Sequence, residues 1–311
     1  MKPPNYNKQE SARMKKNKVE MAPPKAPVII KRYINYREAM DAMRRLRISA
    51  DGSRYVIRFS LSQRIEHLIL IFSFTLLAVT GLSQTYYNTV LGNFILTILG
   101  GIDSSRQIHH VAAFVFGAQS IYHVALYIDE MFVLRRISKM IPAWSDVTDV
   151  VQMLKFNLGL ALHHPRFDRY NFEEKAEYWA LVWGTVIMGA TGLIQLFPIL
   201  LTEAFPGWII PVGRALHRWE AILAVLAILT WHFYHTLIKT LNLSIFTGRM
   251  SFEQMKEEHP LELDYLEQAA AAIHNKLWPV LIEVRVDNVE EEIVVEPEEI
   301  TAKNTVEGIA Q

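Results

Sequence analysis

Four long apolar runs constrain this chain more than any other feature of its sequence. They lie at about residues 65–86, 108–128, 178–201 and 215–241, and each has roughly the 20 residues that a helix needs to cross a bilayer. Backbone polar groups in lipid must be satisfied within their own segment, which favours helices. We therefore expect an all-α integral membrane four-helix bundle. Residues 88–102 are apolar but too short to span, and they predict a helix lying at the membrane surface.

The flanks of this apolar region are polar and differ in charge. Residues 1–65 contain 16 Lys and Arg against 5 Asp and Glu, whereas residues 251–311 contain 4 against 15. We divide the chain into a basic N-terminal extension (1–57), a four-span domain (58–250) and an acidic C-terminal tail. Such asymmetry suggests ends that face protein partners or lipid head groups. We expect no nucleic-acid partner.

The short loops predict the orientation of the spans. One basic residue, Arg106, lies between spans one and two, and one, Arg214, between spans three and four. The loop between spans two and three carries Arg135, Arg136, Lys139, Lys155, Arg166, Arg169 and Lys175. Because basic loops stay on the cytoplasmic side, both termini and the middle loop are expected in the cytoplasm.

The flanks also contain segments with local patterns. Tyr36–Ile48 predicts a basic amphipathic helix that lies on anionic lipid or docks a subunit. Residues 261–277 predict a helix, and 281–286 alternate as a short strand would. The run MAPPKAP (21–27) predicts an extended linker, and the acidic run 289–300 a solvated segment.

The chain has no cysteine and 11 histidines. This excludes cysteine-ligated iron–sulfur clusters, thioether-attached haem and disulfides within the chain. An unpartnered imidazole in hydrocarbon costs roughly 2–7 kcal/mol. Histidines inside the spans are therefore candidates for function.

The histidines of the spans fall into two layers. His232 lies 15 residues after His217, or about 22 Å along a helix, and His123 lies 14 residues after His109, or about 21 Å. With the predicted orientation, the outer layer contains His109, His110 and His217, and the inner layer contains His67, His123 and His232. Facing helices can supply one imidazole to each side of a haem, so each layer can bind one haem.

Each histidine also has an ordinary interpretation as a satisfied polar contact. His110 points about 100° away from His109, so one of the two is expected not to be a ligand. His235 shares a face with His217 but lies about 27 Å from it, at the head groups, which favours His232. His163 and His164 are expected to be solvated, and His259 and His274 stay unassigned.

The spans resemble a known family. RIEHLILIFSFTLLAVTGL, SRQIHHVAAF, RYNFEEKAEYWALVWGTVIMGATGLI and ALHRWEAILAVLAILTWHFY are similar to the di-haem cytochrome b (gamma) subunit of membrane-bound formate dehydrogenases and to the cytochrome b of nickel–iron hydrogenases. The resemblance covers about residues 58–250. It implies two haem b groups, an outer one on His109 and His217 and an inner one on His67 and His232.

His123 departs from that family pattern. A pairing of His109 and His123 with His217 and His232 would instead resemble the cytochrome b of bc-type complexes. The RIEH opening favours His67, which leaves His123 as a polar group near the inner haem or the quinone.

The resemblance further implies a pocket for menaquinone or ubiquinone beside the inner haem, formed by His67 and by Asn171 of the RYN motif. Asn171 could equally be only a helix cap. The implied partners are iron–sulfur and catalytic oxidoreductase subunits, or a multihaem cytochrome.

The expected role is a non-catalytic electron-transfer subunit with a quinone-reactive site in a bacterial or archaeal cell membrane. A haem-free histidine-relay transporter and a structural anchor are the alternatives. A transporter would bring acidic residues into the spans, and Glu66 and Glu220 approach the ends of the predicted ones.

Overall fold

Four long apolar helices form the body of the protein in the computed structural model, which describes residues 29–34, 36–133, 138–274 and 280–285. They are α3 (Leu61–Thr85), α5 (Ile102–Ile128), α7 (Phe172–Leu196) and α9 (Ile209–Ala227). The π-helical segment η1 (Asp129–Val133) prolongs α5, and η2 (Ile228–His232) and η3 (Tyr234–Lys239) prolong α9. All four are long and apolar enough to cross a membrane, as the hydropathy predicts.

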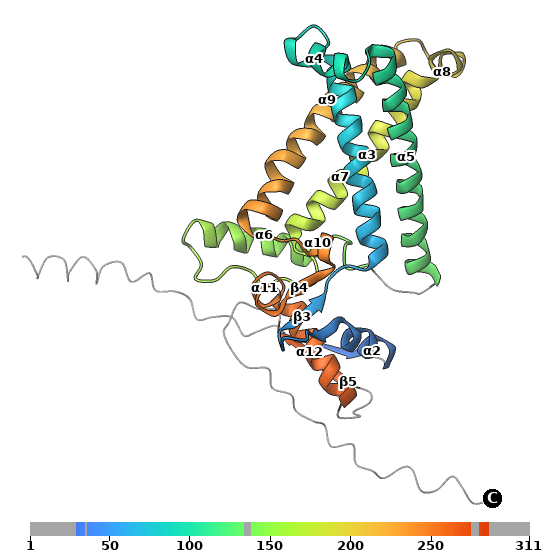
Figure 1. Ribbon diagram of the computed structural model, residues 1–311. Helices are drawn as coiled ribbons and strands as arrows, with labels where there is room; N and C mark the ends of the chain where they lie inside the picture. The colour runs from blue at the N-terminus through green and yellow to red at the C-terminus, as the bar shows by residue number, and fades with distance from the viewer. Residues whose placement is uncertain (1–28, 35, 134–137, 275–279, 286–311) are drawn as a thin grey trace, which may run out of the picture.

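The helices pack as two hairpins. α3 contacts α5, α7 contacts α9, and α3 also contacts α9. Figure 1 shows α5 and α9 well separated at the lower end of the bundle, where a small folded unit lies; this end is called the cap end below. Apolar side chains such as Phe72, Phe114 and Ile121 are more than two-thirds exposed. An apolar exterior of this kind is what lipid contact requires.

Local signals set the ends of the spans. Ser60 caps α3 in a capping box with Gln63, and Asn171 caps α7 in the same way with Glu174. Pro198 opens the short helix α8 (Pro198–Ala204). Because proline cannot continue a helix, α7 ends at Leu196 rather than at 201, where the apolar run ends.

Two short helices lie at the end of the bundle opposite the cap, α4 (Val90–Ile98) and α8 (Figure 1). α4 is the helix predicted within residues 88–102. A further helix, α6 (Trp144–Asn157), runs across the cap end. Its side chains Trp144, Val147 and Leu154 are more than half exposed.

The cap is built from both flanks of the chain. Its helices are α2 (Tyr36–Arg45), α10 (Ser244–Thr247), α11 (Phe252–Glu258) and α12 (Pro260–His274). Its strands β2 (Leu46–Ile48), β3 (Arg54–Ile57) and β4 (Arg249–Ser251) form one antiparallel sheet in that order. The strands β1 (Ile29–Ile34) and β5 (Val280–Arg285) form a second antiparallel pair. β5 lies where the alternating pattern predicts a strand.

These sheets correct the all-α prediction: the chain is mostly helical, with four long apolar helices and two small sheets. β2 and β4 have three residues each, too few to show an alternating pattern. β3 and β4 come together only because the four spans return the chain to the end where it entered. The segment Tyr36–Ile48 is also not one helix. Its last three residues pair with β3.

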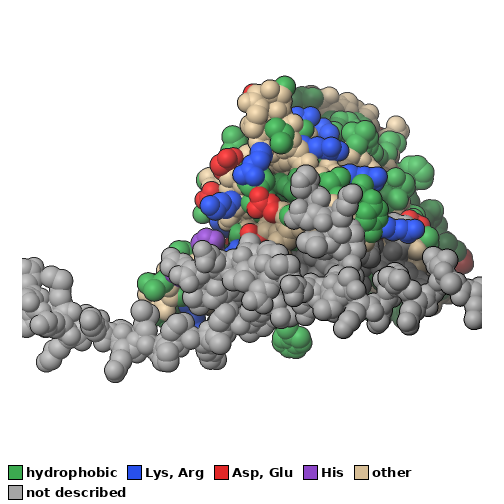
Figure 2. Space-filling view, turned by 90° about the horizontal axis from the view of Figure 1, so that it is seen from below, with side chains coloured by type: hydrophobic (Ala, Val, Ile, Leu, Met, Phe, Trp, Pro, Cys, Tyr) green, Lys and Arg blue, Asp and Glu red, His purple; other side chains and the backbone are tan. Residues whose placement is uncertain are grey.

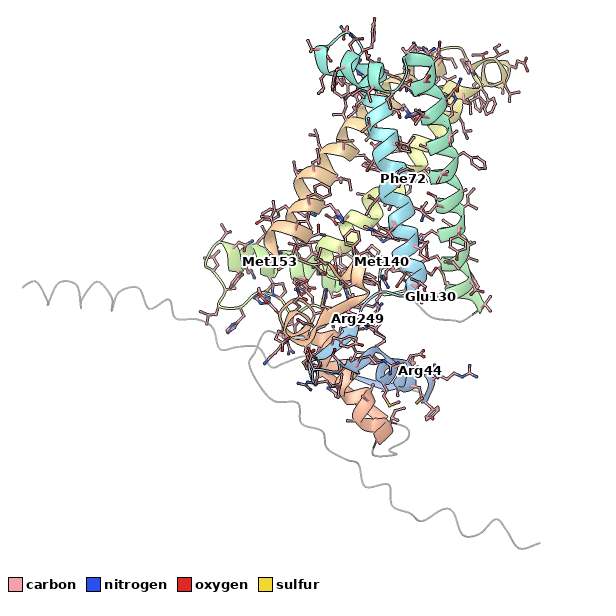
Figure 3. The ribbon with its side chains drawn as sticks, in the orientation of Figure 1. Arg44, Phe72, Glu130, Met140, Met153 and Arg249 are labelled. Carbon is pink, nitrogen blue, oxygen red and sulfur yellow. The ribbon has the colours of Figure 1, made fainter. Side chains whose placement is uncertain are left out.

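The first part of that segment, α2, packs inside the cap rather than standing free. Ala39 and Ala42 are buried in an apolar core with Leu263, Leu266 and Ala269 of α12 and with Met250 and Met255. Arg44, at the end of α2, points away from the cap and is exposed (Figure 3). The linker at 21–27 and the acidic run 289–300 lie outside the described residues.

A buried carboxylate ties the cap to the bundle. Glu262 of α12 is 1% exposed and bonds Arg45 of α2, Lys139 and Arg169. Burial alone would raise the pKa of Glu262, but the three cations outweigh it and hold the pKa far below its usual range. Figure 2 views this end of the molecule and shows how charged side chains of both signs gather on it.

A second contact joins cap and bundle through Arg58, which is also buried. Its guanidinium donates to Glu174 of α7 (3.2 Å) and to Nε2 of His259 (3.1 Å), while Nδ1 of His259 donates to the Asp168 carbonyl (2.8 Å). Burial and the nearby Arg58 lower the pKa of His259 to about 4. The imidazole is therefore neutral in the folded cap.

We predict that Glu262→Gln destabilises the cap by about 3–5 kcal/mol, because it leaves three partly buried cations without the buried carboxylate that they share. Hydrogen exchange of α12 in the intact, detergent-solubilised protein measures the effect. The matched control is Glu267→Gln, whose ion pair with Arg54 is about half exposed; it should cost less than about 1 kcal/mol. Equal effects of the two variants would contradict the prediction.

Stability should also fall with acidification through His259. Its pKa is about 4 in the folded chain against 6.5 ordinarily, so the unfolded chain binds more protons between these values. Lowering the pH from about 7 to 4 should therefore cost about 3 kcal/mol from this group. The urea midpoint measured across this range checks it. In His259→Gln the pH slope should flatten, and an unchanged slope would refute the assignment.

Candidate functional site

Two pairs of histidines face each other across the bundle at different depths. His109 of α5 faces His217 of α9 with 6.4 Å between ring centroids, and His67 of α3 faces His232 of η2 at 6.3 Å. Two imidazole nitrogens on opposite sides of one iron, each at roughly 2 Å, place the centroids roughly 6 Å apart. Both pairs thus have the separation of a bis-histidine haem site.

The π-helical turn of η2 aligns the two histidines of α9 and its continuation. In an ideal α-helix His232, 15 residues after His217, would point about 60° away from it. From Ile228 the chain is π-helical, and a wider turn of about 4.4 residues advances each residue by only about 82°. The four steps from Ile228 to His232 therefore bring the two side chains to within about 10° of the same face.

Hydroxyl groups orient the pair farther from the cap. The Thr80 hydroxyl lies 2.8 Å from Nδ1 of His109, and the Thr191 hydroxyl 2.9 Å from Nδ1 of His217. Each hydroxyl donates its proton to a backbone carbonyl one turn earlier, so its oxygen accepts from Nδ1–H. Nε2 of each ring is then left with its lone pair free to bind a metal.

A glycine lies against each of these rings. A Cβ on Gly81 would lie 3.2 Å from Cε1 of His109, closer than ordinary contact, whereas a Cβ on Gly192 would lie 3.5 Å from Cε1 of His217, an ordinary van der Waals distance. Each glycine directly follows the threonine that orients the ring, so a Thr-Gly dipeptide builds each side of the pair.

The histidine pair nearer the cap has different hydrogen-bond partners. Nδ1 of His232 lies 3.0 Å from a carboxylate oxygen of Glu177. Because a carboxylate only accepts, Nδ1 carries the proton and Nε2 is again free to bind a metal. Nδ1 of His67 is buried and has no hydrogen-bond partner among the described residues.

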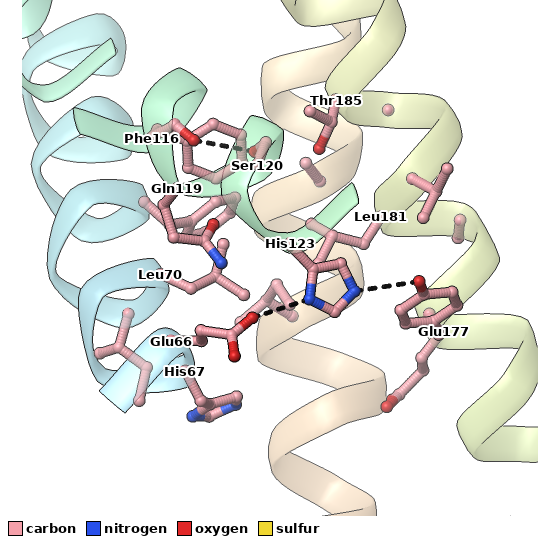
Figure 4. Close-up of a pocket in the computed structure, with 18 of the residues that line it drawn as sticks. Glu66, His67, Leu70, Phe116, Gln119, Ser120, His123, Glu177, Leu181 and Thr185 are labelled. Atoms are coloured by element: carbon pink, nitrogen blue, oxygen red, sulfur yellow. Dashed lines mark hydrogen bonds and ion pairs between the residues drawn. The ribbon is translucent and has the colours of Figure 1, made fainter. Parts of the chain in front are cut away.

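His123 lies in this layer but does not face another histidine. Its Nδ1 bonds Glu66 at 2.9 Å and its Nε2 bonds the Tyr178 hydroxyl at 3.1 Å. Figure 4 shows the His123 imidazole bonded to Glu66, with His67, the residue that follows Glu66, on the same helix α3. Both ring nitrogens of His123 are thus engaged with protein groups.

The two hairpins repeat one arrangement. In each, a glutamate precedes a Thr-Gly dipeptide by 14 residues in the first helix, and two histidines lie 14 or 15 residues apart in the second. Glutamate and threonine contact the two histidines of their own hairpin: Glu66 with His123, Thr80 with His109, Glu177 with His232, and Thr191 with His217. The residue after the glutamate differs, being a histidine in α3 and a tyrosine in α7.

This repeat accounts for His123. The pair His67–His232 and the pair Tyr178–His123 both cross between the hairpins and occupy equivalent places. A histidine in α3 makes one of them a pair of imidazoles. A tyrosine in α7 makes the other a closed hydrogen bond.

A continuous cavity of about 3250 Å³ connects both histidine pairs. It extends from Gln84 and Arg214 at one end to Arg45 and Lys139 at the cap. Small-molecule sites usually occupy roughly 300–1,000 Å³, so this cavity has room for more than one cofactor. The histidine spacing and the cavity together fit haem at both levels.

The other predicted site residues lie apart from these pairs. The Asn171 side-chain oxygen accepts from the Glu174 backbone N–H at 2.7 Å and so caps α7. His235 bonds the Trp231 carbonyl and approaches Glu173. His110 lines the cavity, but its neighbour His109 faces His217.

Sequence reasoning missed the groups that hold the rings. Glu177 stands one residue before the apolar run that predicts span three, whereas α7 begins at Phe172. Thr80 and Thr191 looked like ordinary small residues of the spans. The repeated Thr-Gly-Leu in spans one and three, each 14 residues after a glutamate, was the available signal.

Comparison with known proteins finds relatives among the membrane cytochromes b. A family model described as prokaryotic cytochrome b561 matches residues 58–277. The formate dehydrogenase cytochrome b556(fdo) subunit of Escherichia coli strain K12 is 26% identical over 216 residues, which are 66% of this chain and 90% of that protein. The same subunit of Escherichia coli O6:H1 and of O157:H7 matches equally.

Proposed function

Because this chain belongs to the prokaryotic cytochrome b561 family, we propose that it is the di-haem b membrane subunit of a respiratory complex. It moves electrons between a partner redox subunit and the membrane quinone pool. The observation that carries the proposal is the pair of facing imidazoles at each of two depths, with ring centroids 6.4 and 6.3 Å apart.

The ligands we assign are His109 and His217 for one haem and His67 and His232 for the other. His123 is not a ligand in this proposal, because Glu66 and Tyr178 hold both its ring nitrogens. That engagement argues against the bc-type pairing, in which His123 would bind iron. Bound haem supplies one-electron chemistry, while the chain holds the ligand rings and excludes water from them.

The quinone site belongs at the cap end, beside His67. A quinone carbonyl needs a hydrogen-bond donor, and Nδ1 of His67 is buried without a partner among the described residues. Asn171 is the second candidate, through the amide nitrogen that its capping role leaves over. Menaquinone and ubiquinone both carry the carbonyl groups that this site would bind.

The partners and orientation follow from the relatives and from charge. The likeness to a formate dehydrogenase subunit supports iron–sulfur and catalytic subunits at the end opposite the cap, and a multihaem cytochrome would serve equally as donor. The basic loop around Lys139 supports a cytoplasmic cap with both termini inside. In a bacterial or archaeal cell membrane, the quinone would then exchange protons with the cytoplasm.

The test is a haem count on the purified chain and two variants. A pyridine haemochrome assay should give two b haems per wild-type chain, and the reduced-minus-oxidised spectrum should show both. His67→Ala should lose one haem, because an axial ligand is removed. His123→Ala should keep two, since it removes only a hydrogen-bonded neighbour.

The outcomes separate the alternatives. No haem in the wild-type chain would overturn the proposal and support a haem-free histidine relay or an anchor. Loss of a haem in His123→Ala but not in His67→Ala would support the bc-type pairing instead. His164→Ala, in an exposed loop, controls for general effects of removing an imidazole.

A further inference from the structure

We propose that Glu177 sets the reduction potential of the haem nearer the cap by holding the His232 ligand as a strong electron donor. This rests on the proposed function, since it requires haem on His67 and His232. Glu177 touches the ligand and not the iron, so it is a positioning and tuning residue.

The contact is specific in geometry. The Glu177 carboxylate comes from the second turn of α7 and reaches across to η2, where one oxygen lies 3.0 Å from Nδ1 of His232. Its other oxygen is buried and has no hydrogen-bond partner among the described residues. The His232 N–H is thus the only hydrogen-bond donor to this carboxylate among the described residues.

Neighbouring carboxylates are engaged elsewhere. Glu173 pairs with Lys239 and approaches His235, and Glu174 pairs with Arg58 and closes the capping box of α7. Both therefore have cations beside them. Of the three glutamates at the start of α7, Glu177 is the one directed at a proposed ligand.

The equivalent glutamate of the other hairpin makes the contrast sharper. Glu66 accepts from Ser62 at 3.0 Å on one oxygen and bonds His123 at 2.9 Å on the other. Both of its oxygens are satisfied, and its histidine is not a proposed ligand. The same Glu–His device is therefore coupled to haem in one hairpin only.

The two proposed haem sites then differ in the group that accepts a hydrogen bond from Nδ1 of the ligands. A threonine hydroxyl accepts from each of His109 and His217, whereas a carboxylate accepts from His232. A carboxylate on the N–H of a ligating imidazole makes the ring a stronger base. A stronger donor and a nearby negative charge both favour ferric over ferrous iron, which lowers the potential.

The experiment is a spectroelectrochemical titration of Glu177→Gln in the purified full-length chain. Glutamine keeps the length and can still accept a hydrogen bond, but it removes the charge. The midpoint of the haem on His67 and His232 should shift to higher potential. The midpoint of the haem on His109 and His217 should not move.

Matched variants identify which haem responds. The variant His109→Leu leaves one complete ligand pair, His67 and His232. In this background, the midpoint of the remaining haem should shift to higher potential when Glu177→Gln is added. Thr191→Val, which removes a neutral acceptor from His217, should shift the other haem by less than Glu177→Gln shifts its own. Glu173→Gln, one turn away, should leave both midpoints unchanged.

The haemochrome assay on the same samples separates the two proposals. Two haems with unchanged midpoints, or a downward shift, in Glu177→Gln would overturn the tuning role and leave the di-haem function standing. No haem in the wild-type chain would overturn the proposed function itself. Should Glu177→Gln lose a haem, Glu177→Asp supplies the second variant: retention of haem with a midpoint above that of wild type supports tuning, and an unchanged midpoint refutes it.

Discussion

The structure depends on one constraint: a polar ring placed among apolar helices is costly unless its nitrogens have partners. Water does not reach such a ring, so a missing partner costs several kcal/mol. The spans meet this cost with short side chains on the facing helix, such as Thr80 for His109 and Glu177 for His232. Each fixes the proton on Nδ1 and leaves Nε2 without a hydrogen, so that its lone pair is free to bind a metal.

In both hairpins, a glutamate and a threonine of the first helix contact the two histidines of the second. The bundle therefore consists of two similar hairpins that differ at one position. His67 follows Glu66, while Tyr178 follows Glu177. At the crossing between hairpins, one place therefore holds two imidazoles and the other a closed tyrosine–histidine bond. The arrangement explains how an extra histidine can lie at the depth of the proposed ligands with both of its own nitrogens bonded.

The spans and the depth layers of the histidines could be predicted because hydropathy and helical rise are local properties of the chain. The hydrogen-bond partners of His123 could not be predicted, since they are Glu66 and Tyr178, which are 57 and 55 residues away. The π-helical turn before His232 has no sequence pattern of its own. The cap sheet could not be predicted either, because its strands β3 and β4 are short and are brought together only by the four spans between them.

The cap and the Glu177 carboxylate that contacts His232 lie at the same end of the molecule. Arg45, Arg58, Lys139 and Arg169 bring four cations to the cavity there, and such charges stabilise a reduced, more negative cofactor. Glu262 neutralises part of that charge by bonding three of them. Glu177 also opposes the effect of the cations, but it does so at His232, a proposed ligand. A negative group on a ligand would lower the potential of one haem without removing the cations that bind the cap to the bundle.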